Sequence, residues 1–401
     1  MQARIVATLS QHPLATHAVG ECAGELLESG GPNPDLLLLA VTPPHAGALE
    51  DVLHATRALL APRVQLGVTS DRLLDGAREV NYSAALSMCA IWFSDSGQNQ
   101  YSGGHTATTG PQVQPVRLSG AVNDIDEIGL QQLRGATGTL ILLADPSLLE
   151  TKLTLDKIAQ LAPGLSIVGG SAGPSRNQGA TRLCLHNSVY ANGMVGALIP
   201  HEVETQASTS QGCRPFGAPL TATRAERNVI YELDGRHALE VTQELLATIA
   251  LENRSAARDS LRIGVLGAQS ANREQVSYFG VLGADKAAES IMIGVEIEQG
   301  ATIQFALRDS TSASADLIDV LSELPATRAA FAFSAGSRAA DFFGRPHHEA
   351  LLISEALDPA ALWGISCFDC FGAQRGAPRL HSQAVSLLVF PEAGDAQQRT
   401  I

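Results

Sequence analysis

The chain has 401 residues, enough for two domains of about 200 residues each. Hydrophobic residues make up 45% of it and charged residues 17%, a balance that is typical of a folded globular protein and excludes a disordered one. The formal net charge is −14 and the only lysines are Lys152, Lys157 and Lys286, which excludes the basic face that nucleic acid or an anionic membrane surface would need.

The N-terminal segment, Met1–Ser10, carries one positive charge and a very short apolar stretch with no cleavage site. It therefore predicts a first strand and not a signal peptide. No apolar run approaches the roughly 20 residues that a membrane span needs. Most of the six cysteines lie in apolar runs, where a free cysteine behaves as a small hydrophobe. We expect a cytoplasmic protein in a reducing compartment.

A strand, a helix and a second strand follow one another in residues 35–70. Residues 35–42 read Asp-Leu-Leu-Leu-Leu-Ala-Val-Thr, residues 45–61 have a helical pattern, and residues 64–70 are again apolar. Continuous apolar runs predict strands buried on both faces, and the helix between them predicts a parallel crossover. The unit closes on Gly67, Thr69 and Ser70, which predict a turn of small residues suited to holding a small ligand.

The same pattern returns twice. A second copy occupies residues 139–173 and closes on Gly-Gly-Ser-Ala-Gly, and a third occupies residues 330–372 and closes on Cys-Phe-Asp-Cys-Phe-Gly. The first two copies have nearly equal strand spacing, which favours an internal pseudo-repeat, although common βαβ units can also coincide. Between the copies, short loops predict antiparallel hairpins. The expected fold class is α/β with mixed sheets, built from βαβ crossovers plus antiparallel hairpins.

Periodicity lapses around residues 200–217, where Ser, Thr, Gln and Gly dominate. This predicts a domain boundary. The expected division is an N-terminal domain of residues 1–200, a junction of residues 201–220 and a C-terminal domain of residues 221–395. A second irregular stretch, residues 94–110, is expected to be a surface loop, and loops of this length are often functional.

Residues 169–173 match the G-x-S-x-G nucleophile elbow, with Ser171 as the nucleophile of a serine hydrolase. That elbow must turn directly into a helix, whereas Pro174 and a polar run follow here. The alternative is that the glycines allow a close approach of backbone or ligand, while exposed amides around Gly170 and the Ser171 hydroxyl donate hydrogen bonds. No catalytic residue is assigned, and no enzymatic activity is expected.

Cys367 and Cys370 form a CxxC motif, which indicates either a redox pair or half of a zinc site. No second CxxC exists and the motif lies deep in the C-terminal half, so two packed free cysteines are favoured. His105 lies in a polar, glycine-rich loop that could bring it over a pocket. A solvated loop histidine is the simpler interpretation.

Arg214 lies between Cys213 and Pro215 in the segment Gln211–Gly217. A cation held this rigidly at a domain junction suits a carboxylate ligand, since junctions are where pockets tend to form. Equally, it could pair with an internal Asp and fix the linker. Both hypotheses stay open.

Taken in order, the segments resemble the FIST family, which pairs a FIST N domain with a FIST C domain. The resemblance runs from Asp35 to Phe390, and its most specific motifs are Gln211–Gly217, Asn228–Gly235, Glu298–Phe305 leading into Arg308-Asp309 and Asp316-Leu317, and Leu380-His-Ser-Gln-Ala. Three positions depart from the family pattern. Ala335 replaces a Cys, Asp369 replaces a Glu, and His237 replaces a Pro.

The resemblance implies a bacterial, intracellular sensory protein of signal transduction that binds a small ligand. The ligand-binding residues it suggests, together with the turn donors above, are Thr69, Ser70, Gly170, Ser171, Cys213, Arg214, Arg308, Asp309, Arg338 and Asp369. Some FIST proteins resemble haem-binding nitric oxide sensors that act on histidine kinases. That alternative implies haem, with His105 or His237 as axial ligand, and a histidine kinase partner. A serine hydrolase that uses Ser171 and a scaffold with an acidic binding surface are the remaining alternatives.

Overall fold

The protein is described here from a computed structural model, which covers residues 3–93, 112–119, 127–147, 151–173, 181–249, 260–266, 276–374 and 377–392. The chain forms two compact units. The first contains Met1–Thr209 and Val320–Ile401, and the second contains Ser210–Asp319. The predicted domains are continuous in sequence, whereas the first compact unit is assembled from both ends of the chain.

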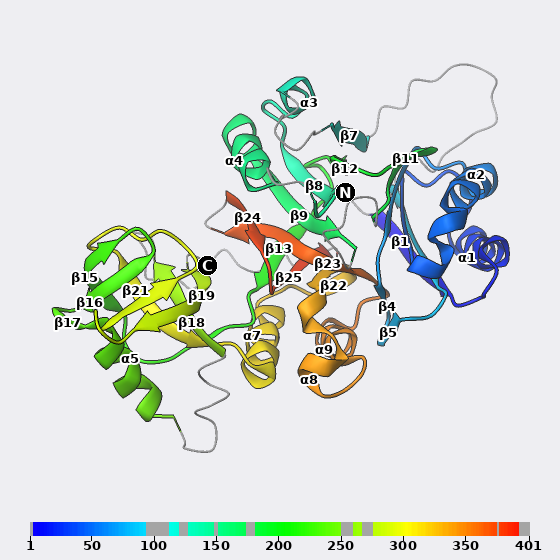
Figure 1. The fold of residues 1–401 in the computed structure, drawn as a ribbon. Coiled ribbons are helices and arrows are strands. Elements are labelled where there is room, and N and C mark those ends of the chain that lie inside the picture. The colour runs from blue at the N-terminus through cyan, green and yellow to red at the C-terminus, as the bar shows by residue number, and fades with distance from the viewer. Residues whose placement is uncertain are drawn as a thin grey trace, which may run out of the picture. The chain divides into compact units, whose positions relative to one another are not determined.

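The first unit contains a six-stranded sheet, blue to green in Figure 1, with strand order β1-β6-β2-β3-β10-β11. These strands are β1 (Ala3–Ser10), β6 (Leu86–Phe93), β2 (Leu36–Val41), β3 (Val64–Thr69), β10 (Leu183–Leu185) and β11 (Ser188–Tyr190). The pair β2 and β3 is parallel, and the other neighbours are antiparallel. Helices α1 (Ala15–Ser29) and α2 (Leu49–Leu60) bury their apolar stripes on one face of this sheet.

The second sheet of this unit has the main path β13-β25-β22-β23-β9-β8-β12-β7. Its strands are β13 (Gln206–Ser210), β25 (Val385–Pro391), β22 (Thr327–Ala335), β23 (Ala361–Gln374), β9 (Leu165–Ala172), β8 (Gly138–Ala144), β12 (Met194–Ile199) and β7 (Gln114–Leu118). Strands β4 (Arg72–Asp75) and β24 (Ala377–His381) pair with β23, and β5 (Arg78–Asn81) pairs with β4. Helices α3 (Glu127–Gln131) and α4 (Thr151–Leu161) pack over β7, β8 and β9.

All three predicted crossovers are present. The strand pairs β2 and β3, β8 and β9, and β22 and β23 are each parallel in register. The first connection contains α2 and the second contains α4. The third contains η4 (Gly336–Arg338), α8 (Ala340–Phe343) and α9 (His348–Leu357). Continuous apolar runs produced these buried parallel strands, as the sequence indicated.

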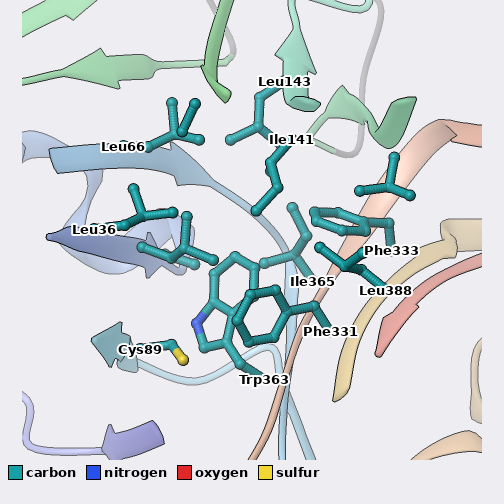
Figure 2. Packing of buried hydrophobic residues seen from close by; sticks show 14 of the residues in the cluster. Leu36, Leu66, Cys89, Ile141, Leu143, Phe331, Phe333, Trp363, Ile365 and Leu388 are labelled. Atoms are coloured by element: carbon teal, nitrogen blue, oxygen red, sulfur yellow. The ribbon is translucent and has the colours of Figure 1, made fainter. Parts of the chain in front are cut away.

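The main core lies where the two sheets pack face to face. Leu36, Leu66 and Cys89 of the first sheet meet Phe331 and Trp363 of the second in Figure 2. The Trp363 ring makes edge contacts with Phe331 and Phe333, with ring centroids 6.0 and 6.2 Å apart. Residues from both ends of the chain therefore share this core.

The closing turns expected after the three crossovers are wrong. Gly67 and Thr69 lie within β3, and of that first turn only Ser70 follows the strand. Residues 169–172 lie within β9, and Cys367–Gly372 lies within β23, which continues to Gln374. Glycine without a side chain lets strands approach closely, and here that property serves sheet pairing and not a turn. A Cβ at Gly170 would lie 2.5 Å from the Asp369 carbonyl oxygen and 2.6 Å from the Cys367 sulfur.

The second unit is a small antiparallel barrel, and helical segments accompany it. Its strands run in the order β21-β15-β16-β20-β19-β18, and a further pairing of β21 with β18 closes the ring. The elements are β14 (Arg214–Pro215), β15 (Leu220–Glu226), β16 (Val229–Leu233), β17 (Arg236–His237), α5 (Ala238–Ala247), β18 (Leu261–Leu266), β19 (Val276–Asp285), β20 (Ser290–Ile293), β21 (Thr302–Leu307) and the start of α7 (Ser310–Ser322). Its core includes Ile230, Ile263 and Phe305.

Within the described ranges, no helix combines the length and apolar character that crossing a bilayer requires.

Substituting Gly170 by Ala should destabilise the protein by about 1–3 kcal/mol or more, because the added methyl meets backbone of the neighbouring strand. Gly24→Ala in α1 is the control. A Cβ at Gly24 would have nothing within 4 Å, and replacing a glycine inside a helix with alanine should raise the free energy of unfolding by about 0.5–1 kcal/mol. Urea denaturation measures both. Equal tolerance at the two positions would contradict the close pairing of β9 with β23.

The imidazole of His381, in β24, generates a pH dependence. Burial lowers its pKa from 6.5 to about 4. The unfolded chain therefore binds a proton as the pH falls through 6.5, while the folded chain does not until about pH 4. Neutral His381 therefore contributes on the order of 3 kcal/mol to the free energy of unfolding above pH 6.5, and this contribution is lost as the pH falls towards 4. In His381→Gln, the free energy of unfolding should change less steeply across this interval, and an unchanged slope would contradict the assignment.

Candidate functional site

Four charged side chains lie buried together in the first unit, next to the carboxyl end of β22. Arg72 begins β4, Glu79 lies in β5, Arg338 ends η4, and Glu349 lies in the first turn of α9. Their exposed fractions are 3%, 7%, 0% and 0%. We call these four residues the buried ionic cluster. Charges buried this deeply are costly unless they are paired and hydrogen-bonded.

Arg72 joins three elements of the fold. Its Nη1 lies 3.0 Å from Glu79 Oε2 and donates to the Arg338 carbonyl oxygen at 2.8 Å. Its Nη2 donates to the Ser334 hydroxyl at 2.9 Å and lies 3.5 Å from Glu349 Oε2. The guanidinium therefore connects the β4–β5 hairpin with β22 and α9.

The two carboxylates are equally well engaged. Glu349 Oε1 accepts from Arg338 Nε at 2.6 Å, and its Oε2 accepts from the Ser334 hydroxyl. Glu79 Oε1 accepts from the backbone N–H groups of Glu349 and Ala350 at 3.1 and 3.3 Å. Glu79 thus caps the N-terminus of α9, where a negative charge is favourable.

Arg338 has more unsatisfied donors than any other member of the cluster, although the buried Nε of Arg72 also has no hydrogen-bond partner among the described residues. Its guanidinium carbon lies 5.5 Å from the ring centroid of Phe343, a cation–π contact. Nη1 and Nη2 are buried and have no hydrogen-bond partner within the described part of the chain. A buried guanidinium nitrogen without an acceptor is costly, so this edge of Arg338 needs an explanation.

The carboxyl ends of other strands lie in the same region. Ser70, directly after β3, accepts from the Ser366 N–H at 3.1 Å, and its Oγ lies 3.0 Å from the Ser366 carbonyl oxygen. The Thr69 hydroxyl accepts from the Arg182 N–H at 2.9 Å. The Ser70 contacts join the residue after β3 to β23, which follows β22 in the sheet, and the Thr69 contact joins the end of β3 to the residue before β10.

A β-bulge marks the pairing of β23 with β9. Cys367 is opposite Ala172 and Cys370 is opposite Gly170, so Phe368 and Asp369 together face the single residue Ser171. Asp369 and Ser171 are 4% and 2% exposed. Bulges of this kind redirect a side chain and are frequent next to functional sites.

Six of the predicted ligand-binding residues therefore lie in the first unit, namely Thr69, Ser70, Gly170, Ser171, Arg338 and Asp369. The other four, Cys213, Arg214, Arg308 and Asp309, lie in the second unit.

In the second unit, Asp316 holds the Gln211–Gly217 segment. Its Oδ2 accepts from the Ser210 hydroxyl and the Gly212 N–H, each at 2.8 Å. Arg214 is exposed and, within the described residues, has no ion pair, so Asp316 and not Arg214 fixes the segment. Asp309 is a helix cap, because its Oδ1 accepts from the Ser312 N–H at 2.7 Å.

Ser171 does not lie in an elbow. It is an internal residue of β9, in register with Ala144, whereas the nucleophile of an elbow lies at a sharp strand-to-helix turn. The residues 174–180 that would form such a turn lie outside the described residues.

Cys367 and Cys370 are free and buried, as the sequence favoured. The Cys370 thiol donates to the Phe333 carbonyl oxygen at 3.0 Å, and burial raises the pKa of the Cys367 thiol well above 9.0. Such thiols are poor nucleophiles. No group of metal-ligating side chains occurs among the described residues.

The two candidate haem ligands give little support to haem. His105 lies outside the described residues. The His237 side chain is 51% exposed, and its Nε2 lies 3.2 Å from Glu289 Oε2. A half-exposed imidazole beside a carboxylate does not fit an axial ligand enclosed in an apolar haem pocket.

Comparison with known proteins decides the family. The FIST N domain family model matches residues 35–236, and the FIST C domain model matches residues 238–368. The chain belongs to the FIST family. An uncharacterized protein of Mycobacterium bovis is 30% identical over 388 residues, 94% of this chain and 96% of its own length. An uncharacterized protein of Mycobacterium tuberculosis is 29% identical over 404 residues, 96% of this chain and 99% of its own length.

FIST domains are associated with small-ligand sensing in signal transduction. In this FIST protein, the boundary between the two matched domains falls inside the second compact unit, between β17 and α5. The first unit therefore draws strands from both family domains. Of the three positions expected to depart from the family pattern, Ala335 ends β22, Asp369 lies in the bulge of β23, and His237 has a half-exposed side chain in β17.

Sequence reasoning found Arg338 but missed Arg72, Glu79, Ser334 and Glu349. Arg72 carried a readable signal, because it follows Thr69, Ser70 and Asp71 directly after a buried strand. Glu349 had none, since an acidic residue in the first turn of a helix is usually solvated.

Glu349→Leu should destabilise the FIST protein by about 3–5 kcal/mol, because Arg338 would stay buried without its carboxylate. The double variant Arg338→Met with Glu349→Leu removes both charges and should recover most of that loss. Urea denaturation of the two variants tests this. Arg236→Ala, which removes the exposed pairs with Glu240 and Glu244, is the surface control and should change little. A double variant no more stable than the single one would contradict the pairing.

Proposed function

We propose that this FIST protein is a small-ligand-binding sensory protein that acts in signal transduction without catalytic activity of its own. Its ligand would bind in the first compact unit, beside the buried ionic cluster. The observation that carries the proposal is the cluster itself, two arginines and two glutamates at most 7% exposed at the carboxyl ends of parallel strands. Ligands of α/β proteins bind at such strand ends.

Stability alone is a poor reason for the cluster. Replacing a buried ion pair with well-packed apolar side chains is often neutral or stabilising. Ionisable side chains gathered and buried at strand ends are therefore candidates for a functional site. Family membership favours sensing over catalysis, and Ser171 inside β9 lacks the context of a nucleophile.

The cluster also offers a route for a signal. Arg72 touches the β4–β5 hairpin through Glu79, β22 through Ser334 and α9 through Glu349. A ligand that draws Arg338 away from Glu349 would change the partners of all three elements. We propose that this rearrangement, in a cytoplasmic protein, is read by a signalling partner such as a histidine kinase.

The first experiment is to identify a ligand and locate it. Native mass spectrometry of freshly purified protein detects co-purified small molecules, and a metabolite library screened by thermal shift detects others. In the variant Arg338→Met with Glu349→Gln, which preserves charge balance, the shift given by any such molecule should fall at least threefold. Arg214→Ala, an exposed arginine of the second unit, is the matched control and should keep it.

Two results would contradict the proposal. If no molecule co-purifies and none of the library shifts the transition, small-ligand sensing is wrong. If Arg214→Ala removes the shift while the cluster variant keeps it, the ligand binds in the second unit.

A further inference from the structure

Arg338 is held in place by groups that leave one side of its guanidinium unused. Nε donates to Glu349 Oε1 at 2.6 Å, and the ring of Phe343 lies 5.5 Å from the guanidinium carbon. The side chain is 0% exposed, and neither Nη atom has a hydrogen-bond partner within the described ranges. Four N–H donors are thus buried on a group that cannot lose its charge.

Glu349 does not accept from either Nη atom in this structure. Its Oε1 is occupied by Arg338 Nε, while its Oε2 accepts from Ser334 and lies 3.5 Å from Arg72 Nη2. Arg72 is the internal comparison. Both of its Nη atoms have acceptors, on Glu79, Ser334 and the Arg338 carbonyl oxygen. Among the described residues, Arg72 leaves one N–H without a partner, on Nε, whereas Arg338 leaves the four N–H groups of its two Nη atoms, so only Arg338 presents a pair of donor nitrogens for a planar acceptor.

The surrounding charge sets the chemistry of an acceptor. Within the cluster, two guanidinium groups face two carboxylates, and the N-terminus of α9 adds a partial positive charge of about one half. Two further carboxylates lie in this region, that of Asp71, whose charge acts on Cys367, and that of Asp369, 4% exposed in β23. A single negative charge is therefore favoured over two.

We infer that Nη1 and Nη2 of Arg338 bind a carboxylate group of a small ligand. This inference rests on the proposed function and names the chemical class that the site takes. A planar carboxylate matches two parallel N–H donors, and charge-assisted pairs of this kind are roughly twice as strong as neutral ones. Ser70 directly follows β3, and Ser171 faces Asp369 at the bulge between β9 and β23, so the remainder of the ligand would be recognised there.

The test compares carboxylates with amides of the same shape, which lack the charge, and with phosphate, which is charged but not planar. Wild-type protein is titrated with sodium acetate, propionate and benzoate, with the corresponding amides, and with phosphate, at constant ionic strength set by sodium chloride. The thermal midpoint gives an apparent Kd for each probe. We expect each carboxylate to bind at least tenfold more tightly than its amide and more tightly than phosphate.

Three variants connect the effect to Arg338. In Arg338→Met with Glu349→Gln, carboxylate binding should weaken at least tenfold. In Arg338→Lys, which keeps the charge but loses the planar fork, it should weaken at least threefold. Arg214→Ala should leave it unchanged. Circular dichroism and the urea midpoint confirm that each variant is folded before titration.

Amides that equal the carboxylates, phosphate that binds more tightly than they do, or carboxylate binding that survives in the double variant would overturn the inference. These outcomes are separable from failure of the proposed function. If a neutral library compound binds and its binding depends on the cluster, the proposed sensory function stands and the carboxylate inference is wrong. If no small molecule has any effect, both the proposed function and the carboxylate inference are wrong.

Discussion

The hydrogen bonds of Arg72 are the interaction on which the first compact unit depends. This one side chain is 3% exposed and reaches the β4–β5 hairpin, the end of β22 and the N-terminus of α9. The hairpin is far from the other two in sequence, so no local rule would bring them together. Because Arg72 is charged and buried, the three elements must keep their relative positions, since each lost partner would leave the buried ion unsatisfied.

Arg338 completes the same arrangement from the opposite side. Its backbone carbonyl accepts from Arg72, and its Nε donates to Glu349, so the two arginines are mutually positioned. A ligand that engages Arg338 would therefore act on a network already shared by three elements. Coupling of this kind needs no long pathway, since the responding groups are in direct contact.

The sequence predicted the fold well where apolar runs were continuous. The parallel pairs Leu36 with Val64 and Ala330 with Leu362 follow from such runs. It failed at Gly169 to Ala172 and Cys367 to Gly372, because small residues that serve close strand pairing look the same in sequence as those that form turns. The site was predicted in part. Ser70, Ser171 and Arg338 could be recognised from their local sequence. Glu79 and Glu349 could not, because they join the site through contacts between residues about 270 positions apart, such as the hydrogen bond from the Glu349 N–H to Glu79.

The order of strands in the second sheet also bears on biosynthesis. Strand β9 is flanked by β8 on one side and by β23 on the other. During translation, β9 leaves the ribosome long before β23, with the whole barrel of residues 210–319 made in between. Until the last strands arrive, one edge of an apolar sheet stays unpaired, which is the condition that favours aggregation and chaperone binding. The barrel, in contrast, has all of its strands available earlier and can close while the ribosome is still completing the first unit.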